Sequence, residues 1–335
     1  MRALLLAAGY GVRLRPFTEH TPKPLLPVLN VPIIEYGLRL LRAHGIAEIA
    51  VNLHYLGEQV EEHLGDGSRF GVSIRYSWEP EILGTGGGIK RVADFLGGGT
   101  FLVMNADTLC DCDLTAAVAR HRERGGIATM LVRDDPRVAQ FGAVEYDARG
   151  RIVQIAGKVE DPPPCEGRLA RALFTGVHIM EPRALDYIPD GRRVCVNEVA
   201  YPAMLARGEA VFADVVTGYW SDLGDPRRLV EANLDLLYRK ATLSYFDPLG
   251  SDAILLGHGV LLRGTAVLRP PTLVGAGCRI ADGAVVGPGA VLGRDCKIGE
   301  AAHIEESLLL PGTEAPPGTR YCRVIADRHG AVVAT

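Results

Sequence analysis

The first two thirds of the chain alternate between two patterns of apolar residues. Apolar runs of five or six residues are separated by longer stretches in which apolar side chains recur every three or four positions, which predicts buried strands between amphipathic helices. The predicted strands are residues 3–8, 49–53, 72–76, 100–105 and 127–132, and the predicted helices are residues 32–41, 60–64, 89–96 and 114–124, the last with Asp113 as its N-cap. This alternation predicts an α/β fold with a Rossmann-like, mostly parallel sheet. In such sheets ligands lie beyond the carboxyl ends of the strands.

A different period begins near residue 250. Aliphatic residues stand six positions apart, and a small side chain follows most of them by four positions. The aliphatic positions are Leu256, Leu262, Leu268, Val274, Ile280, Val286, Leu292, Ile298, Ile304 and Leu310. This period suits neither a helix nor an ordinary strand pair, and it resembles the hexapeptide repeat of left-handed parallel β-helices. We therefore expect a β-helix over residues 251–325, with a glycine-rich β-sandwich as the alternative.

The change of period predicts two domains, residues 1–238 and residues 251–325, joined by residues 240–250. The chain has 335 residues and a formal net charge of −4, which gives no support for a nucleic-acid-binding surface. Its apolar runs stay well short of the ~20 residues of a membrane span. The seven cysteines include no CxxC pair, so we expect neither a zinc site nor a disulfide framework. These features favour a protein of the cytoplasm.

The loop after the first predicted strand carries the candidate chemistry. Residues 7–18 read AAGYGVRLRPFT and residues 21–25 read TPKPL. Glycines at the end of a strand let backbone N–H groups approach phosphate oxygens, and Arg13 and Lys23 add two cations. A dinucleotide fingerprint would need a third glycine at Leu14, and a Walker A loop would need a Gly-Lys-Ser/Thr triplet that the sequence lacks. The loop therefore suits a polyphosphate held for attack at one phosphorus.

This loop resembles the signature of the sugar-1-phosphate nucleotidylyltransferases, and among these it is most similar to the mannose-1-phosphate guanylyltransferases. The resemblance covers residues 1–238, and a β-helical tail is common in the family. A further segment, EPEILGTGGG at 79–88, resembles the family's base-binding loop. NAD at 105–107 and WSDLGDP at 220–226 resemble its two metal-binding segments. FG at 141–142, K at 158 and TG at 175–176 resemble its contacts with the sugar phosphate. LGDGSRFG at 64–71 also resembles uridylyltransferase relatives.

The resemblance implies an enzyme that joins a sugar 1-phosphate to the α-phosphorus of a nucleoside triphosphate and releases pyrophosphate. Such a reaction needs alignment and charge stabilisation more than covalent chemistry. Arg13 is expected to hold the pyrophosphate, Lys23 the α-phosphate and Lys158 the sugar phosphate. Asp107 and Asp222 are expected to share a Mg²⁺ ion. The other implied substrate-binding residues are Ala8, Gly9, Gly11, Glu79, Gly84, Thr85, Gly142, Thr175, Gly176 and Glu198.

The base and the sugar are less closely defined. Glu79 lies where several relatives place a Gln that reads uracil, and a carboxylate can accept hydrogen bonds from both N1–H and the N2 amino group of guanine. This favours GTP with mannose 1-phosphate, with a UTP- or dTTP-dependent enzyme as the alternative. Gly157 and Phe174 replace the Glu and Asn that the family often has beside the sugar.

Two other functional classes are compatible with this fold. A catalytically silent regulatory subunit would have lost phosphate cations or metal carboxylates, yet Arg13, Lys23, Asp107 and Asp222 are all present. Acyl transfer by the β-helix would need a catalytic His and a pocket between long β-helices, which about three coils do not favour. We expect the C-terminal domain to hold a homo-oligomer together instead, because the end of a β-helix exposes an apolar edge.

Overall fold

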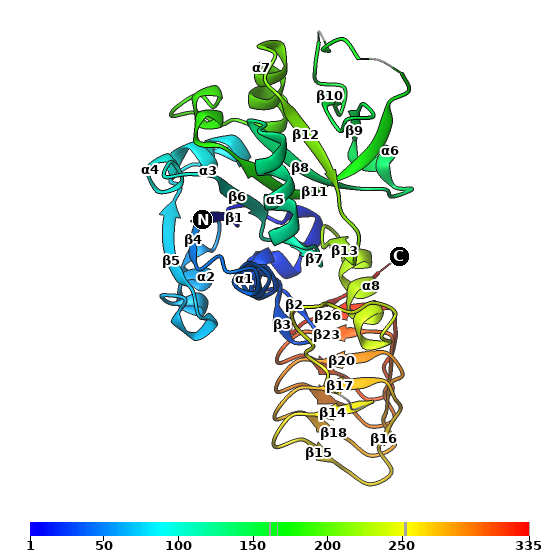
Figure 1. Ribbon diagram of the computed structural model, residues 1–335. Coiled ribbons are helices and arrows are strands. Elements are labelled where there is room, and N and C mark those ends of the chain that lie inside the picture. The colour runs from blue at the N-terminus through cyan, green and yellow to red at the C-terminus, as the bar shows by residue number, and fades with distance from the viewer. Residues whose placement is uncertain (161, 166, 251–252, 335) are drawn as a thin grey trace. The chain divides into compact units, whose positions relative to one another are not determined.

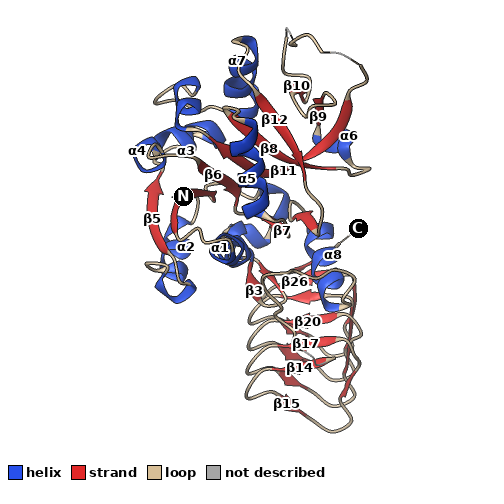
Figure 2. Cartoon of the chain, in the orientation of Figure 1, coloured by secondary structure: helices blue, strands red, loops and turns tan. Residues whose placement is uncertain are grey.

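The computed structural model describes residues 1–160, 162–165, 167–250 and 253–334. The chain divides into two compact units, which we call unit 1 (Met1–Gly9 and Gly37–Trp220) and unit 2 (Tyr10–Tyr36 and Ser221–Thr335). Figures 1 and 2 show the elements of each. The loop of residues 10–36 thus belongs to the same unit as the C-terminal repeats. The division into domains at residues 238–251 stays a prediction.

Unit 1 is built on a mixed sheet with a parallel centre. Its strands are β1 (Arg2–Leu6), β4 (Glu48–Leu53), β5 (Ser73–Trp78), β6 (Phe101–Asn105), β8 (Ala128–Arg133), β9 (Ala143–Tyr146), β10 (Ile152–Ile155), β11 (Ala170–Met180) and β12 (Val211–Val215). β1 lies between β4 and β6 and is parallel to both, and β5 is parallel to β4. β11 is antiparallel to β6, β8 and β9. The predicted α/β fold with a mostly parallel sheet core is confirmed.

Helices cover both faces of this sheet (Figure 2). They are α1 (Ile33–Ala43), α2 (Gly57–Leu64), α3 (Gly84–Arg91), α4 (Ala93–Leu96), α5 (Leu114–Arg124), α6 (Val138–Phe141) and α7 (Tyr201–Ala206). Residues of α3, α4 and α7 share one core with alternate residues of β1, β6 and β8. On the opposite face a Cβ at Gly37 of α1 would lie 3.4 Å from Leu5 of β1, and His121 of α5 bonds Thr129 of β8.

The start of α3 differs from its prediction. The sequence predicts a helix over residues 89–96, whereas α3 already begins in the glycine-rich run at Gly84 and ends before Val92, where α4 takes over. Glycine disfavours helices, but here the missing side chains permit a close approach. A Cβ at Gly84 would lie 2.7 Å from the carbonyl oxygen of Val194, and one at Gly86 would lie 3.0 Å from the side chain of Val194. Tertiary packing therefore overrides helix propensity at this position.

The C-terminal repeats of unit 2 stack as short parallel strands (Figure 1). The strands are β14 (Ile254–Leu256), β15 (Leu261–Leu262), β16 (Val267–Leu268), β17 (Thr272–Val274), β18 (Arg279–Ile280), β19 (Val285–Val286), β20 (Ala290–Leu292), β21 (Lys297–Ile298), β22 (His303–Glu305), β23 (Leu308–Leu309), β24 (Glu314–Ala315), β25 (Arg320–Cys322), β26 (Val324–Ala326) and β27 (Ala331–Val333). Leu261 pairs with Arg279, eighteen residues on, which is one coil of three hexapeptides. The parallel β-helix is confirmed, and the β-sandwich alternative is wrong.

The last coil departs from the period of six. Leu292 pairs with Leu309, seventeen residues on, so Leu309 takes the inward position that the strict period assigns to Leu310. The turn before β23 is one residue shorter than in the earlier coils, and so is the turn before β26, so the later pairs also stand seventeen residues apart. This end of the β-helix is covered, because β27 pairs antiparallel with β26 and α8 (Pro226–Leu237) packs against both strands.

The remaining part of unit 2 is the loop of residues 10–36. It folds into the 3₁₀ turns Val12–Leu14, Phe17–Glu19 and Lys23–Leu25, followed by a hairpin of β2 (Pro27–Val28) and β3 (Val31–Pro32). Two further short strands are β7 (Thr108–Cys110) in unit 1 and β13 (Trp220–Asp222) at the boundary of the units. Across the described residues, every helix is too short or too polar to traverse a lipid bilayer.

Candidate active site

The predicted phosphate loop of unit 2 turns tightly around Gly11. Gly11 has a φ of +65°, and a Cβ at this position would lie 3.0 Å from both Lys23 Cβ and Thr18 Cγ2. The Thr18 hydroxyl donates a hydrogen bond of 2.9 Å to the Gly11 carbonyl oxygen. Lys23 is 8% exposed, so most of its side chain is fixed by packing. The loop therefore brings together Gly11 and Lys23, two of the residues expected to contact phosphate.

Arg13 and Asp222 converge on Gly224 within unit 2. A Cβ at Gly224 would lie 2.6 Å from Arg13 Nη2 and 2.9 Å from Asp222 Oδ2. Asp222 also forms an ion pair with Arg228 of α8. Arg228 in turn lies 3.4 Å from Asp225, which caps α8 by accepting a hydrogen bond of 3.0 Å from the Arg228 N–H. The Asp222 carboxylate is thus oriented by the start of α8 and stands beside the Arg13 guanidinium.

In unit 1, Asn52 joins the end of β1 to the predicted base loop. Its Oδ1 accepts a hydrogen bond of 2.8 Å from the Ala7 N–H, and its Nδ2 donates one of 2.7 Å to Glu79 Oε1. Glu79 Oε2 accepts a bond of 2.8 Å from the Leu83 N–H, and His54 Nδ1 lies 2.8 Å from the Glu79 carbonyl oxygen. Both carboxylate oxygens of Glu79 are therefore engaged within the protein. Ala8 and Gly9 follow directly on this anchored end of β1.

The predicted base loop is also tied to the segment after residue 193. Gly84 has a φ of +70° and lies against the Val194 carbonyl oxygen. The Thr85 hydroxyl oxygen accepts a hydrogen bond of 3.0 Å from the Val196 N–H. Val196 opens a π-helical turn, Val196–Ala200, and such turns are often found at functional sites. This turn carries Glu198, another of the predicted residues.

Lys158 and Glu198 meet in unit 1. Lys158 Nζ lies 3.2 Å from Glu198 Oε1, and both side chains are about half exposed. An exposed ion pair of this kind contributes little to stability. Gly142, with a φ of +81°, approaches the segment just before Lys158, because a Cβ at Gly142 would lie 2.7 Å from Ala156 Cβ. The structure thus groups three of the residues expected to contact the sugar phosphate.

Asp107 follows β6 and is half-buried. Gly176, with a φ of +87°, approaches the same strand end, because a Cβ there would lie 2.8 Å from Asn105 Nδ2. Thr175 is buried, and its hydroxyl donates a hydrogen bond of 2.8 Å to a carbonyl oxygen of β8. Its own carbonyl oxygen accepts one of 2.8 Å from the Trp220 indole. Thr175 therefore links β8 to Trp220 near the strand end that carries Asp107.

The two predicted metal ligands suit a hard divalent cation. Mg²⁺ keeps several waters and is usually held by one or two carboxylates together with substrate phosphates. Asp107 and Asp222 supply such carboxylates. In the part of the chain that the structure describes, no group of three or more His, Cys, Asp or Glu side chains could hold a metal without a substrate. Each of these two carboxylates is of the kind that Mg²⁺ accepts as a ligand, so the residues present fit the expected ion.

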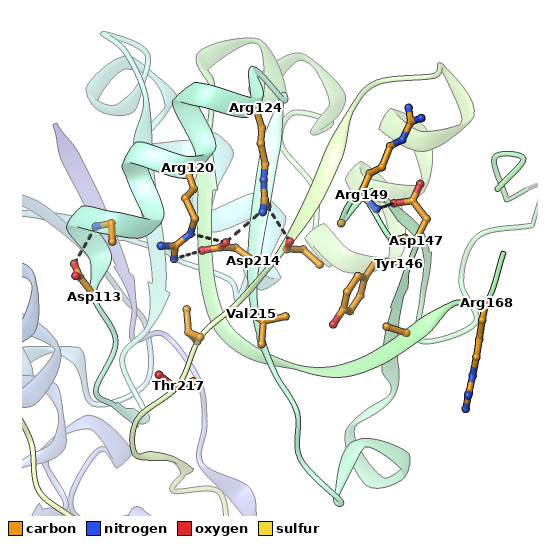
Figure 3. A pocket seen from close by; sticks show the side chains of 16 residues that line it. Asp113, Arg120, Arg124, Tyr146, Asp147, Arg149, Arg168, Asp214, Val215 and Thr217 are labelled. Atoms are coloured by element: carbon orange, nitrogen blue, oxygen red, sulfur yellow. Dashed lines mark hydrogen bonds and ion pairs between the residues drawn. The ribbon is translucent and has the colours of Figure 1, made fainter. Parts of the chain in front are cut away.

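A basic hollow of about 660 Å³ lies elsewhere in unit 1, between α5 and the end of β12 (Figure 3). Asp214 in its wall accepts hydrogen bonds of 2.8 and 2.6 Å from Arg120 and lies 3.7 Å from Arg124. These two arginines thus neutralise a buried carboxylate. The predicted site residues do not line this hollow, whose wall consists of Asp113, Ala116, Arg120, Arg124, Tyr146, Asp147, Ala148, Arg149, Gly150, Arg168, Ala170, Ala213, Asp214, Val215, Val216 and Thr217.

The loop after β8 is pinned by a buried carboxylate. Asp135 accepts two hydrogen bonds of 2.8 Å from the Arg137 guanidinium and lies 3.2 Å from Arg133. The hydrogen bonds from Arg137 lower the pKa of Asp135 to about 2. Both guanidinium groups lie over the Trp220 ring, 5.9 Å (Arg133) and 5.4 Å (Arg137) from its centroid. This cluster fixes the chain that leads to Gly142.

Asn52 and Arg228 are not among the predicted site residues, and Gly224 is predicted only as part of the segment 220–226. Asn52 did carry a signal, since it is a polar residue in an apolar strand, at the carboxyl end next to the phosphate loop. Arg228 lies in the first turn of an ordinary helix, and the approach of Gly224 to Arg13 depends on tertiary packing.

Comparisons with known proteins give the family. Residues 2–239 match the family described as nucleotidyl transferase. The chain is 38% identical over 237 residues to the UTP–glucose-1-phosphate uridylyltransferase of Synechocystis sp., a match that covers 67% of this chain and 60% of that protein. It is 35% identical over 286 residues to the mannose-1-phosphate guanylyltransferase of Mycobacterium tuberculosis, covering 83% and 77%. A crystal structure from Bacillus anthracis, assigned as a glucose-1-phosphate thymidylyltransferase and containing a sucrose, aligns with a TM-score of 0.60 and 26% identity, covering 70% of this chain and 94% of that one. The chain belongs to the nucleotidyl transferase family.

Proposed function

We propose that this protein is a sugar-1-phosphate nucleotidyltransferase that makes a nucleotide sugar and pyrophosphate. The observation that carries the proposal is the approach of Arg13 to Asp222 around Gly224, in a unit whose loop also buries Lys23. Preorganised cations beside a carboxylate are what phosphoryl transfer requires of a protein. The uridylyltransferase and guanylyltransferase named above carry out, by their names, transfers of this class.

In the proposed reaction a phosphate oxygen of the sugar 1-phosphate attacks the α-phosphorus. The bond from that phosphorus to the bridging oxygen breaks, and pyrophosphate leaves. Lys23 neutralises the α-phosphate, Arg13 binds the pyrophosphate, and Lys158 binds the attacking sugar phosphate. The triphosphate and the base lie against Ala8, Gly9, Gly11, Glu79, Gly84 and Thr85, and the sugar phosphate against Gly142, Thr175, Gly176 and Glu198.

Sugar nucleotidyltransferases generally use a divalent metal ion. We propose Mg²⁺, with Asp107 and Asp222 as its protein ligands. When bound, the ion neutralises charge on the phosphate oxygens. The ion pair with Arg228 fixes the direction of the Asp222 carboxylate.

For the substrates, we propose GTP and mannose 1-phosphate, with UTP or dTTP and another sugar 1-phosphate as the second candidate. The Mycobacterium tuberculosis relative supports the first pair, and the Synechocystis relative supports UTP. The hydrogen bonds from Asn52 and Leu83 to Glu79 also favour the second candidate, because guanine could use only the remaining lone pairs of that carboxylate.

The test is pyrophosphate release by purified protein over a matrix of triphosphates and sugar 1-phosphates. We expect GTP with mannose 1-phosphate to give the highest kcat/KM. If UTP or dTTP is used at least about tenfold better than GTP, the guanine assignment is wrong, while nucleotidyl transfer stands. If no pair releases pyrophosphate, the chain is a regulatory subunit of the same fold.

We further propose that residues 1–238 are the catalytic domain, that residues 251–325 are an accessory β-helix, and that the protein works in the cytoplasm. Residues 251 and 252 of that range lie outside the described part of the chain. The seven cysteines, all within the described residues, are free thiols, as a reducing compartment would keep them.

We also propose a homo-oligomer that forms through the first coil of the β-helix. Leu256 and Leu262 occupy inward positions of that coil and yet are 51% and 47% exposed, whereas Val274 and Ile280, one coil further on, are 0% exposed. Among the described residues, β14, β15 and β16 pair on one side only. Such an end needs a cover. A second copy of the same end presents matching strand edges at matching spacing.

The oligomer is tested by measuring molar mass with light scattering during size-exclusion chromatography. Leu256→Gln with Leu262→Gln should reduce the mass to that of a smaller assembly. Val333→Gln is the matched control, because Val333 is 58% exposed at the covered end of the β-helix. A mass that is the same for all three proteins would remove the first coil from the interface.

A further inference from the structure

We propose that Asn52 is a positioning residue for the nucleotide, acting through Glu79. The inference rests on the proposed use of a nucleoside triphosphate. Asn52 stands between the two segments expected to hold that substrate, the phosphate loop that begins after β1 and the base loop at residues 79–88.

One amide group makes both connections. Asn52 Oδ1 receives the Ala7 N–H at 2.8 Å, and Asn52 Nδ2 donates to Glu79 Oε1 at 2.7 Å. Asn52 is 3% exposed and Glu79 is 2% exposed, so water does not compete for these bonds. A displacement of either loop would leave a buried N–H or a buried carboxylate oxygen without its partner, which costs more than an exposed bond is worth.

Glu79 passes the constraint on to α3. Its second oxygen accepts a hydrogen bond of 2.8 Å from the N–H of Leu83, the residue before the first turn of α3. A negative charge at this end of a helix is favourable, because the unpaired N–H groups there carry partial positive charge. The carboxylate thus caps α3 at the point where Gly84 and Thr85 begin the predicted contact with the base.

The chemistry of position 52 selects an amide. The Ala7 N–H needs an acceptor, and the Glu79 carboxylate needs a donor. Leucine, of similar size, would satisfy neither, and aspartate would satisfy only Ala7 while placing two carboxylates in contact. Gly88 closes the space above the pair, because a Cβ there would lie 2.7 Å from Asn52 Nδ2 and 3.0 Å from Glu79 Oε1.

The experiment exchanges the amide of Asn52 and the carboxylate of Glu79. In Asn52→Asp, an oxygen faces Glu79, and the KM for the triphosphate should rise about tenfold or more, with the KM for the sugar 1-phosphate within about twofold of wild type. Glu79→Gln alone should also raise the triphosphate KM, because an amide cannot accept from Asn52 and Leu83 on both of its polar atoms. The double variant restores every bond, because the new amide nitrogen at position 79 donates to the new carboxylate at position 52 while the amide oxygen accepts from the Leu83 N–H. Its kcat/KM for the triphosphate should exceed that of the poorer single variant by at least about threefold.

Thr129→Val is the control, because it removes a buried hydrogen bond of 2.8 Å to His121 in the same unit, away from both loops. It should lower the melting temperature and leave both KM values unchanged. If the double variant is no better than the poorer single variant, Asn52 does not act through Glu79. If an exchange variant fails to fold, Asn52→Ala and Glu79→Ala are combined instead, and additive losses of kcat/KM overturn the inference. Failure of the proposed function appears in the wild type itself, which would then release no pyrophosphate with any pair.

Discussion

Replacing Gly88 with alanine adds one methyl group beside the Asn52–Glu79 pair. Gly88 lies in α3 with ordinary helical backbone, so alanine meets no strain of its own there. The new Cβ would lie 2.7 Å from Asn52 Nδ2, whereas non-bonded heavy atoms rest at about 3.5 Å. The amide must therefore move by about 0.8 Å or α3 must lift by a similar amount. The first movement stretches the 2.7 Å bond from Asn52 to Glu79, and the second stretches the 2.8 Å bond from Leu83 to Glu79. In each case the bond exceeds the usual hydrogen-bond range, which ends at about 3.2 Å.

The expected cost follows from the bond that is lost. A hydrogen bond to a charged group contributes about 1.5–3 kcal/mol, and alanine in place of glycine returns about 1 kcal/mol through helix propensity. We therefore expect Gly88→Ala to lower the free energy of unfolding by about 0.5–2 kcal/mol. The helix gain does not help the loops to hold substrate. The full loss of about 1.5–3 kcal/mol appears in kcat/KM for the triphosphate, a loss of about ten- to a hundredfold.

The assay is pyrophosphate release as a function of triphosphate concentration, together with urea unfolding. Gly37→Ala is the matched control, because Gly37 is also a buried glycine in a helix. A Cβ there would make an ordinary contact of 3.4 Å with Leu5. That variant should be as stable as wild type or more stable, with unchanged kinetics. Wild-type kinetics in Gly88→Ala would refute the reasoning, since they would mean that the pair can move without consequence for the nucleotide.

The remaining predictions concern the metal, the phosphate, the β-helix and pH. Asp107→Asn should keep the fold and lose about 100-fold or more in turnover at saturating Mg²⁺, and EDTA should stop the wild-type reaction; near-normal turnover would remove Asp107 from the site. Lys23→Ala should raise the activation free energy of the reaction by about 3–4 kcal/mol and so lower kcat. A change confined to KM would mean that Lys23 only binds substrate. Val286→Asp places a charge at a position that is 0% exposed and should unfold the β-helix, as seen in the loss of its urea transition. Burial lowers the pKa of His178 to about 3, below the ~6.5 of an unfolded histidine. Between pH 6.5 and pH 3, therefore, the unfolded chain binds a proton at His178 and the folded chain does not. The free energy of unfolding should fall by about 2 kcal/mol from pH 7 to pH 5, and His178→Gln should make this fall smaller.

The strands and the repeat could be predicted because their signals are local. A buried strand shows as a run of apolar residues, and one coil of the β-helix shows as a fixed period, whatever the rest of the chain does. The early start of α3 could not be predicted, because its glycines are chosen for the approach to Val194 and not for helix propensity. The shift from Leu310 to Leu309 could not be predicted either, because a strict period cannot show where a turn loses one residue.

In the candidate site, too, local signals could be predicted and tertiary contacts could not. Arg13, Lys23, Asp107 and Asp222 were found from motifs, since each stands in a short segment with recognisable neighbours. Their supports were not found. Arg228 reaches Asp222 from the first turn of α8, and nothing in its own segment separates it from an ordinary helical arginine. Motifs therefore predict which groups are expected to contact substrate, while the residues that hold those groups emerge only from packing.

Unit 2 holds the β-helix together with the predicted phosphate loop and one predicted metal ligand. The phosphate loop is followed by the β2–β3 hairpin, and that hairpin is held from two sides within the unit. The Leu29 N–H donates a hydrogen bond of 2.8 Å to Asn233 of α8, and Asn30 Nδ2 donates one of 2.8 Å to the carbonyl oxygen of Leu292 in the β-helix. Since α8 also orients Asp222 through Arg228, one helix braces both the loop with Lys23 and the predicted metal ligand. The β-helix that packs against α8 thus supports both of these predicted groups within one compact unit.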